Sequence, residues 1–544
     1  MIDRPIFTCQ TRLTLTPAQS ELLDRYAALH GEVQRALFAA LKAGRNANEI
    51  KSTFQNQYSI LARHYNSARI ELDGKIRSIK ERRTGLLTES RARIKKAEQG
   101  IKKLTAIAPH SNKLHQKKRR LASLLARYQR MKHDDDAGRV RLCFGSKKRF
   151  HAQFNLEANG YANHAAWRAD WQRARSEQFL VVGSKDETAG NQLCQTRLRD
   201  DATFTLALRL PDAIAPDLAK PHLELSGVQF AYGHEDIVHA LSSGEKISMI
   251  SASGRATKKR IGTPLSYRFL RDEKGWRVFV SLLAAPVDKT CTSLRGAIGV
   301  DINADHLAVA ETDRFGNLTR AHRLEAVTYG KSPHQTRAIL GDAANKIARL
   351  AQTSGQPVAV EKLDFAKKKS TLESVSKDRS RALSSFAYGR ALASIKSACY
   401  RHGVELIEIN PAYTSVIGAV NFAQRLGRST HQGAALAIAR RSLGLSERPT
   451  VRTRLVPARN GGHVTFALPV RNRAKHVWSF WSKIQTSLKA AHVAHYRCGA
   501  HKAAPPPLTP AMRSSSAIWS SSAKSRSANR PPHCSVDVLD EIPE

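Results

Sequence analysis

Acidic residues are scarce in this chain, and the resulting imbalance of charge excludes whole classes of function. The 544 residues include 88 Lys and Arg but only 46 Asp and Glu, so the formal net charge at neutral pH is +42. Because like charges oppose compaction unless a polyanion neutralises them, this balance argues against an ordinary metabolic enzyme. It favours nucleic acid as the partner, since Lys and Arg neutralise phosphates and release counterions. A basic structural protein is the competing interpretation.

Paired cysteines and long apolar runs are also lacking. The seven cysteines are scattered through the sequence, and no two of them form a Cys-x-x-Cys pair. This spacing provides neither a disulfide framework nor a zinc ribbon, so no zinc is predicted. No apolar run approaches the roughly 18 residues of a membrane span, and the first residues do not resemble a signal peptide. We therefore expect no membrane partner and a cytoplasmic, nucleoid-associated location in a bacterium.

Hydrophobic residues make up 41% of the chain, which is enough for buried cores. Changes in their periodicity predict a multidomain α+β protein. We expect a first strand in residues 1–16, helices through 17–178, and a β-barrel, or alternatively a sandwich, through 179–295. An α/β domain is expected in 296–497, and a disordered tail in 498–544, which is rich in Pro and Ser and lacks periodicity.

The stretch 75–132 is strongly basic, with 19 Lys and Arg against three Glu. Its apolar residues recur at spacings of three, four and seven on both sides of the turn Ala108-Pro109-His110, which predicts two amphipathic helices folded back on each other. A solvated coiled-coil hairpin has the same pattern, but the scarcity of acids leaves few of the i,i+4 pairs that stabilise exposed helices. We therefore interpret this hairpin as a nucleic-acid-binding surface. The candidate contacts are Lys95, Lys96, Lys102, Lys103, Lys117, Lys118, Arg119 and Arg120.

Two acidic residues lie in or at the end of apolar strands in the second half of the sequence. Asp301 lies in the apolar run 297–310, and Glu361 follows the run Val358-Ala359-Val360. An acid in such a strand is costly unless it is paired or binds a metal. Carboxylate ligands suit Mg²⁺ or Mn²⁺, which assist phosphodiester hydrolysis. Alternatively, Asp301 caps local backbone and Glu361 is a surface residue at a turn.

The elements expected around these acids follow a recognisable order. A three-stranded meander begins at 297, and helices are predicted at 335–353, 385–402 and 431–441, with single strands before the second and third helices. Meander, helix, strand, helix, strand, helix is the order of an RNase H-like domain. The region 296–497 is therefore predicted to have this fold.

Three motifs resemble TnpB, the transposon-encoded RNA-guided nuclease family from which type V CRISPR effectors are thought to descend. They are Gly299-Val300-Asp301-Ile302-Asn303, Val360-Glu361-Lys362-Leu363-Asp364-Phe365 and Asn410-Pro411-Ala412-Tyr413-Thr414-Ser415. The resemblance is specific over 296–445 and only architectural over 1–295. It implies a wedge domain formed by 1–16 and 179–295, a recognition domain at 17–178 and a RuvC-type nuclease domain at 296–497. It also implies that Asp301 and Glu361 bind the catalytic metal, and that the partners are a guide RNA and a double-stranded DNA target.

The sequence departs from the TnpB pattern in two places. Only 15 residues without cysteine, Val416 to Thr430, occupy the position of the family's zinc ribbon. The helix that usually begins with the third metal-binding Asp instead places His431 at that position. One interpretation makes His431 a working ligand, since imidazole suits Mn²⁺ better than Mg²⁺ and some similar resolvases use His on this helix. In a second, the site is inactive. In a third, another acid substitutes, the candidates being Asp364, Glu408 and Asp305.

Lys367, Lys368 and Lys369 follow the strand of Glu361 and are further candidates for phosphate contact. Together these features predict a metal-dependent, RNA-guided DNA endonuclease of a transposon or CRISPR-like system, with Asp301, Glu361 and His431 as its catalytic and metal-binding residues. The alternative is a nuclease-dead, RNA-guided DNA-binding protein that acts as a transcriptional repressor or targeting factor.

Overall fold

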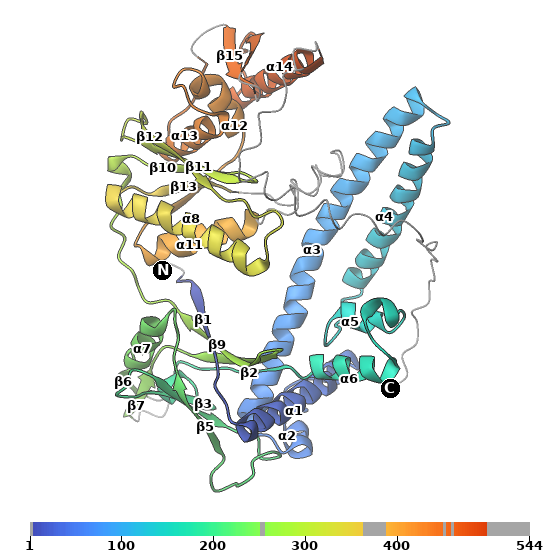
Figure 1. Cartoon of the computed structure of the whole chain (residues 1–544), viewed down its shortest axis with the longest axis vertical. Coiled ribbons are helices and arrows are strands. Elements are labelled where there is room, and N and C mark those ends of the chain that lie inside the picture. Colours follow the sequence, from blue (N-terminus) through green and yellow to red (C-terminus); the bar gives the residue numbers. More distant parts are fainter. Residues whose placement is uncertain (1–3, 251–255, 363–387, 450–452, 459–461, 498–544) are drawn as a thin grey trace, which may run out of the picture. The chain divides into compact units, whose positions relative to one another are not determined.

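Figure 1 shows the computed structural model of the chain, which describes residues 4–250, 256–362, 388–449, 453–458 and 462–497. The chain divides into two compact units. The first comprises Met1–Cys291, Ala326–Gly355 and Lys362–Glu405, and the second comprises Thr292–Glu325, Gln356–Glu361 and Leu406–Glu544. The tail at 498–544 and the residues Lys367, Lys368 and Lys369 lie outside the described residues. No described helix is both long and apolar enough to cross a lipid bilayer.

The strands of the first unit form three antiparallel sheets. A four-stranded sheet has the order β1-β9-β8-β2, a three-stranded sheet the order β3-β4-β5, and β6 pairs with β7. The strands are β1 Ile6–Arg12, β2 Gln178–Val181, β3 Cys194–Leu198, β4 Phe204–Arg209, β5 His222–Val228, β6 Glu245–Ile250, β7 Ala256–Ile261, β8 Ser266–Asp272 and β9 Gly275–Leu283.

The structure corrects the prediction of a β-barrel over 179–295. Among the described residues, β1 pairs only with β9 and β2 only with β8, so the four-stranded sheet has two edges and does not close. Its inward side chains, such as Phe179 and Trp276, instead share one core with those of the three-stranded sheet, such as Phe204 and Leu206. Alternating hydrophobicity specifies one buried face for each strand, which a pair of packed sheets satisfies as well as a closed barrel.

Helices make up the remainder of the first unit. They are α1 Pro17–Lys42, α2 Lys51–Tyr58, α3 Ala62–Ile107, α4 Asn112–Asp136, α5 Lys147–Ala152, α6 His164–Ala174, α7 His234–Ser242, α8 Pro333–Ser354 and α11 Tyr388–Arg401, with 3₁₀ turns at Glu157–Asn159 and Thr188–Gly190. Helix α1 begins as its sequence predicts. Thr16 is the N-cap, Pro17 occupies the first turn, and Gln19 completes a capping box.

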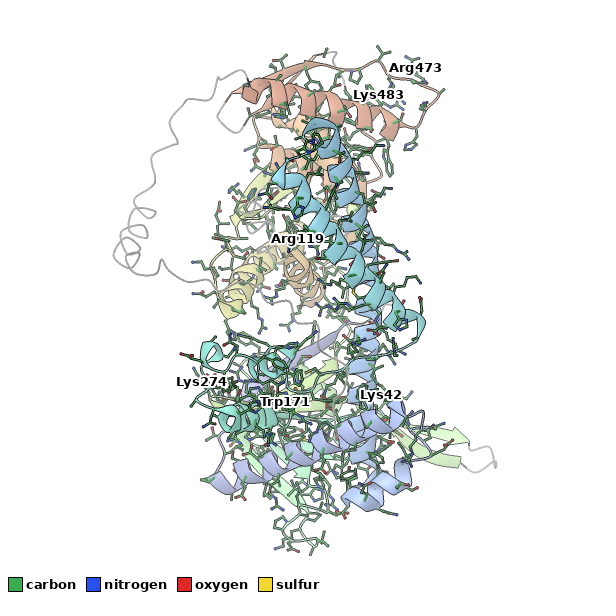
Figure 2. All side chains as sticks on the ribbon, turned by 90° about the vertical axis from the view of Figure 1, so that its right-hand side faces the viewer. Lys42, Arg119, Trp171, Lys274, Arg473 and Lys483 are labelled. Atoms are coloured by element: carbon green, nitrogen blue, oxygen red, sulfur yellow. The ribbon has the colours of Figure 1, made fainter. Side chains whose placement is uncertain are left out.

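Helices α3 and α4 form the predicted hairpin, which we call the basic hairpin (Figure 1). Its turn lies at 108–111, and the Ser111 side chain accepts a hydrogen bond from the Leu114 backbone N–H to cap α4. Beyond the base of the hairpin, only Ile94 and Leu114 among its apolar side chains are fully buried. Arg119, on α4, is labelled in Figure 2. The thin apolar seam leaves most of the hairpin's basic side chains exposed or half-buried.

A buried carboxylate joins α1, α3 and β2 at the base of the basic hairpin. Glu71 on α3 accepts hydrogen bonds from His30 at 2.7 Å and Gln34 at 2.7 Å on α1, and from Gln178 on β2 at 3.0 Å. Burial by itself raises the pKa of Glu71, but the hydrogen bond and charge of His30, with the charge of Lys75, outweigh it and lower the pKa to about 2. Glu71 therefore stays ionised at neutral pH and ties the three elements together.

The second unit contains a five-stranded mixed sheet of order β12-β11-β10-β13-β14. Its strands are β10 Ile298–Ile302, β11 His306–Thr312, β12 Leu318–Glu325, β13 Val358–Glu361 and β14 Leu406–Ile409. The meander β10-β11-β12 is antiparallel, whereas β10, β13 and β14 are parallel. A 3₁₀ turn at Ser293–Arg295 precedes β10. After the sheet the chain continues through α12 Thr414–Ile417, a π-helical turn at Gly418–Ala423, α13 Thr430–Ser442, the hairpin β15 Thr453–Pro457 and β16 His463–Ala467, and α14 Val477–Arg497. With α8 and α11, these elements follow the order predicted for an RNase H-like domain.

Helix α13 lies directly against the backbone of β10. A Cβ added at Gly299 would lie 2.0 Å from the Ala435 carbonyl oxygen and 2.6 Å from the Ala439 nitrogen. Ala359 of β13 and Ile438 of α13 share a small core on the same face of the sheet. Glycine and alanine at the crossing therefore bring the helix closer to the sheet than larger side chains would allow. Because Gly299 and Asp301 project from the same face of β10, α13 covers the face that carries Asp301.

We predict that Gly299→Val destabilises the second unit by roughly 2–4 kcal/mol, because the added methyl groups meet backbone atoms that cannot move away. Hydrogen–deuterium exchange of the α13 peptides should become faster in this variant. The control is Gly85→Ala in α3, where a new Cβ meets nothing within 4 Å. That change should leave exchange in α13 unaltered and stabilise α3 slightly. Unchanged protection of α13 in Gly299→Val would contradict the close packing.

Candidate active site

The two predicted acids lie at matching positions of adjacent parallel strands. The register pairs Ile298 with Val358 and Val300 with Val360, so the next pair is Asp301 and Glu361. Neighbouring strands lie about 4.8 Å apart, and side chains in register project from the same face. Asp301 is 8% exposed and Glu361 is half-buried. The sheet therefore presents both carboxylates on the face that α13 covers.

His431 lies in the first turn of α13, after the N-cap residue Ser429. Its Nδ1 atom is 3.2 Å from Oδ2 of Asp301, across 130 residues of sequence. The imidazole is 47% exposed, whereas the Asp301 side chain is 11% exposed. The structure thus brings Asp301 and His431 into contact, and one end of this contact is open to solvent.

A short polar network also contacts Asp301 and His431. Asn303 donates a hydrogen bond through Nδ2 to Oδ2 of Asp301 at 3.0 Å. His306, which is 3% exposed, lies with Nε2 3.5 Å from the same Asn303 nitrogen, and its ring packs edge-on against His431 with centroids 5.1 Å apart. Nδ1 of His306 is 2.8 Å from Asp305. Burial raises the pKa of Asp305, but the hydrogen bond to His306 and the charge of Arg323 lower it below its usual value overall. Asp305 is therefore an ionised acceptor that orients His306.

The Asn-Pro-Ala-Tyr-Thr-Ser motif supports the other acid. Tyr413 adopts a left-handed backbone conformation with φ of 63°, and α12 begins directly after it. This turn places the fully buried Thr414 so that its hydroxyl donates a hydrogen bond to Glu361. Arg441 of α13 donates hydrogen bonds to the carbonyl oxygens of Asn410 at 2.5 Å and Ala412 at 2.9 Å. The motif therefore holds Glu361 in place through Thr414, and Arg441 of α13 holds the motif.

The donor set fits a divalent cation in part. The 3.2 Å between Asp301 Oδ2 and His431 Nδ1 is a hydrogen-bond distance, so Nε2 is the His431 nitrogen that is left to bind an ion. Oδ1 of Asp301 makes no hydrogen bond within the described part of the chain, and it remains available as a hard oxygen ligand. However, within that part no three His, Cys, Asp or Glu side chains converge closely enough to hold one ion. The structure therefore pairs Asp301 with His431 but does not bring Glu361 into a three-residue cluster with them.

The three acids considered as substitutes for the missing Asp differ in position. Glu408 pairs with Val360 across the β13–β14 ladder, and adjacent residues of a strand alternate between faces, so Glu408 projects away from the face of Glu361. Asp305 is bound to His306 and to Arg323, at 3.2 Å. Asp364 lies outside the described residues. Neither described acid thus replaces His431 beside Asp301.

The predicted nucleic-acid contacts belong to the first unit. Lys95, Lys102 and Lys103 are exposed on α3, and Lys96 is half-exposed. Lys118, Arg119 and Arg120 are exposed on α4, and Lys117 is half-exposed. The i,i+4 ion pairs of the hairpin include Arg69–Asp73, Lys75–Glu71, Arg93–Glu89 and Lys132–Asp136.

Sequence reasoning missed the supporting residues of the site. In the sequence, Asn303 and Thr414 each appear only as part of a motif, yet each donates a hydrogen bond to one of the two acids. His306 was missed entirely. A signal for it exists, because a histidine that opens an apolar strand must find a polar partner when it is buried.

Comparisons with known proteins give little guidance for this chain. No family model matches it, and no curated protein matches it. Among solved structures, it is similar to T. thermophilus RuvC in complex with Holliday junction substrate, at 18% identity and a TM-score of 0.19, over 26% of this chain and 89% of that one. It is also similar to a Cas12f1–sgRNA–target DNA complex, at 10% identity and a TM-score of 0.20, over 80% of this chain and 99% of that one. A CRISPR-Cas12f ternary complex is similar at 11% identity and a TM-score of 0.19, over 80% of this chain and 98% of that one. At these TM-scores, none of the superpositions defines the activity of this chain.

We predict that Thr414→Val weakens Mn²⁺ binding by roughly 10- to 100-fold, because it removes the hydroxyl that holds Glu361 while keeping the side-chain volume. Thr414→Ser retains the hydroxyl and should bind Mn²⁺ within a few-fold of the wild-type protein. Isothermal titration of the full-length protein with Mn²⁺ provides the measurement. Equal affinities in all three proteins would show that Glu361 does not need this hydrogen bond to bind metal.

Proposed function

We propose that this protein is an RNA-guided DNA endonuclease of a transposon or CRISPR-like system, which hydrolyses phosphodiesters with Mg²⁺ or Mn²⁺. One observation carries the proposal: Asp301 and Glu361 directly follow Val300 and Val360, the last register pair of two adjacent parallel strands, and His431 contacts Asp301 at 3.2 Å. These are the two acids and the helix position that the TnpB resemblance implies for a nuclease site. Without such a role, a nearly buried acid paired with histidines in an apolar sheet has no evident purpose.

The substrate class follows from charge. A chain with a net charge of +42 requires a polyanionic partner, and 19 of its Lys and Arg residues lie in the 75–132 stretch that contains the basic hairpin. The resemblance of the three motifs to TnpB implies that the guide is an RNA and that the target is a double-stranded DNA. This part of the proposal rests on the resemblance and on charge.

The side chains of the site have distinct tasks in this proposal. Asn303 holds Oδ2 of Asp301, which leaves Oδ1 directed to other ligands, and Thr414 holds Glu361. When Nδ1 of His431 donates to Asp301, its Nε2 atom carries the lone pair and can accept a proton or a metal. A divalent ion bound here would polarise the phosphodiester and lower the pKa of a bound water. His431 replaces a carboxylate, so the site carries one negative charge fewer and should favour Mn²⁺ over Mg²⁺.

A second function is favoured by the same histidine. With imidazole at the third position, and without a three-residue ligand cluster in the described part of the chain, the site binds metal more weakly than a site with three carboxylates. A guide-dependent DNA-binding protein that does not cut is therefore the alternative, acting as a repressor or targeting factor.

Programmed plasmid cleavage distinguishes the two functions. We expect the wild-type protein with its guide to cut a matched plasmid faster in Mn²⁺ than in Mg²⁺. Asp301→Ala should lower the rate by at least about 100-fold, because it removes a ligand that His431 and Asn303 position. His431→Ala should be similarly impaired, whereas His431→Asp should shift the preference towards Mg²⁺.

Binding of the same plasmid, measured in parallel, serves as the control. Matched-target binding without cutting in either metal would favour the non-cleaving alternative. Cleavage that survives Asp301→Ala would exclude the proposed site, because the activity would then arise elsewhere.

Guide dependence and the basic hairpin have a separate test. We expect a defined RNA to remain bound to the purified protein after a high-salt wash. Removing three exposed charges of the hairpin should lower the slope of log Kd against log salt concentration by about 2. Each lost phosphate contact reduces this slope by roughly 0.7 for a single strand. The test variant replaces Lys102, Lys118 and Arg119 with Ala.

The matched control replaces three exposed lysines outside the hairpin: Lys42, Lys220 and Lys274. Its salt dependence should match that of the wild-type protein. If the slope of log Kd against log salt concentration falls equally in the two triple variants, the charge acts through the whole surface and the hairpin has no special role. If no RNA co-purifies, guide dependence is wrong.

A further inference from the structure

A groove of about 620 Å³ lies on the first unit. Helices α8 and α11, which lie side by side, provide two of its walls, and Tyr232 from the turn before α7 provides a third. On α11 the lining residues recur at one-turn spacing, as Arg390, Ser394, Ser397 and Arg401. Such spacing places them on one stripe of the helix. The first and last of these residues are 11 positions apart, or about 16 Å at the rise of an α-helix.

The groove is basic. Three arginines line it, Arg337 on α8 and Arg390 and Arg401 on α11, and no acidic residue does. Within the described part of the chain, no carboxylate lies within ion-pair distance of Arg337 or Arg390, although both are exposed. Arg401 is held differently, because its guanidinium lies 4.6 Å from the centroid of the Phe7 ring. Unpaired guanidinium groups around a hollow are suited to a ligand with several separated negative charges.

Small residues are part of the groove lining. Gly341 of α8 lines it together with Ala393 and Ser394 of α11, and a Cβ added at Gly341 would meet nothing within 4 Å. The absence of larger side chains lets a ligand approach both helices closely, with the Ser394 and Ser397 hydroxyls as hydrogen-bond partners. A larger side chain at position 341 would therefore project into open space and fill the groove without straining the fold.

Tyr232 adds an aromatic surface at the rim. It is 82% exposed, and Gly233 directly after it adopts a left-handed conformation with φ of 75°. An exposed aromatic ring beside a basic groove is the combination that binds single-stranded nucleic acid, in which phosphates meet the charges and a base stacks on the ring. A duplex keeps its bases stacked inside, so Tyr232 has no base to contact in that case.

We propose that this groove binds a short single-stranded segment of nucleic acid, with phosphates on Arg337, Arg390 and Arg401 and a base stacked on Tyr232. A length of about 16 Å accommodates four or five stacked nucleotides at 3.4 Å each. The assignment does not depend on the metal site and holds whether or not the protein cleaves DNA.

Photo-crosslinking of the full-length protein tests the groove separately from other nucleic-acid contacts. The probe is a 12-nucleotide single strand with one central 5-iodouracil, and mass spectrometry reports the crosslinked peptides. We expect a crosslink to the peptide that contains Tyr232. Its yield should fall about ten-fold in Gly341→Phe and in Arg337→Ala/Arg390→Ala. Crosslinks to the basic hairpin should stay constant and serve as the internal reference.

The matched controls lie on α8, at positions that do not line the groove. Ala338→Phe adds the same ring, and Arg349→Ala removes an equal charge, and both residues are exposed. Both variants should crosslink as the wild-type protein does, and circular dichroism should show unchanged helix content in all four variants. Repeating the experiment with Asp301→Ala should leave the Tyr232 crosslink intact, so that failure of the nuclease proposal and failure of this one are distinguishable.

Three outcomes would overturn the assignment. The first is a Tyr232 crosslink that Gly341→Phe does not reduce. The second is competition by inorganic phosphate or a mononucleotide as effective as that of an unlabelled strand, which would indicate an isolated phosphate site. The third is stronger competition by an acidic peptide than by the strand, which would indicate a protein partner.

Discussion

The close contact between α13 and β10 is the constraint on which the candidate site depends. Gly299 has no side chain, so the backbone of α13 at Ala435 and Ala439 lies directly on the strand. This approach carries the first turn of α13 to the end of β10, where His431 contacts Asp301. The same helix holds the Asn-Pro-Ala-Tyr-Thr-Ser turn through Arg441, and that turn supports Glu361 through Thr414. Both acids are therefore positioned through one helix that packs on small residues.

Charge and chemistry occupy different parts of the chain. The basic hairpin and the arginine-lined groove belong to the first unit, whereas Asp301, Glu361 and His431 belong to the second. The hairpin has a thin apolar seam, so most of its basic side chains are exposed or half-buried. In the site of the second unit, by contrast, Asp301 is nearly buried, and both acids accept hydrogen bonds from neighbouring side chains. This division fits a protein in which holding a nucleic acid and cutting it are separate tasks.

Much of this arrangement could be predicted from the sequence. Periodicity and capping residues indicated the basic hairpin, the start of α1 and the order of elements over 296–445, because these depend on local pattern. Closure of the strands in 179–295 could not be predicted, since alternation specifies a buried face but not which edges pair. The roles of Asn303, His306 and Thr414 were also out of reach. Their partners are set by the fold, and the local sequence indicates only that a histidine opening an apolar strand, such as His306, needs a polar partner when it is buried.

The pulsed EPR spectrum of Mn²⁺ bound to the full-length protein tests the central claim most directly, because it identifies the metal's ligands. If Asp301, Glu361 and His431 form the site, the spectrum will show a nitrogen hyperfine coupling from imidazole. The coupling will disappear in His431→Asp while Mn²⁺ stays bound, and Asp301→Ala will weaken binding at least about ten-fold. Two results would contradict the account: tightly bound Mn²⁺ that shows no nitrogen coupling, or an Mn²⁺ affinity that does not change in Asp301→Ala.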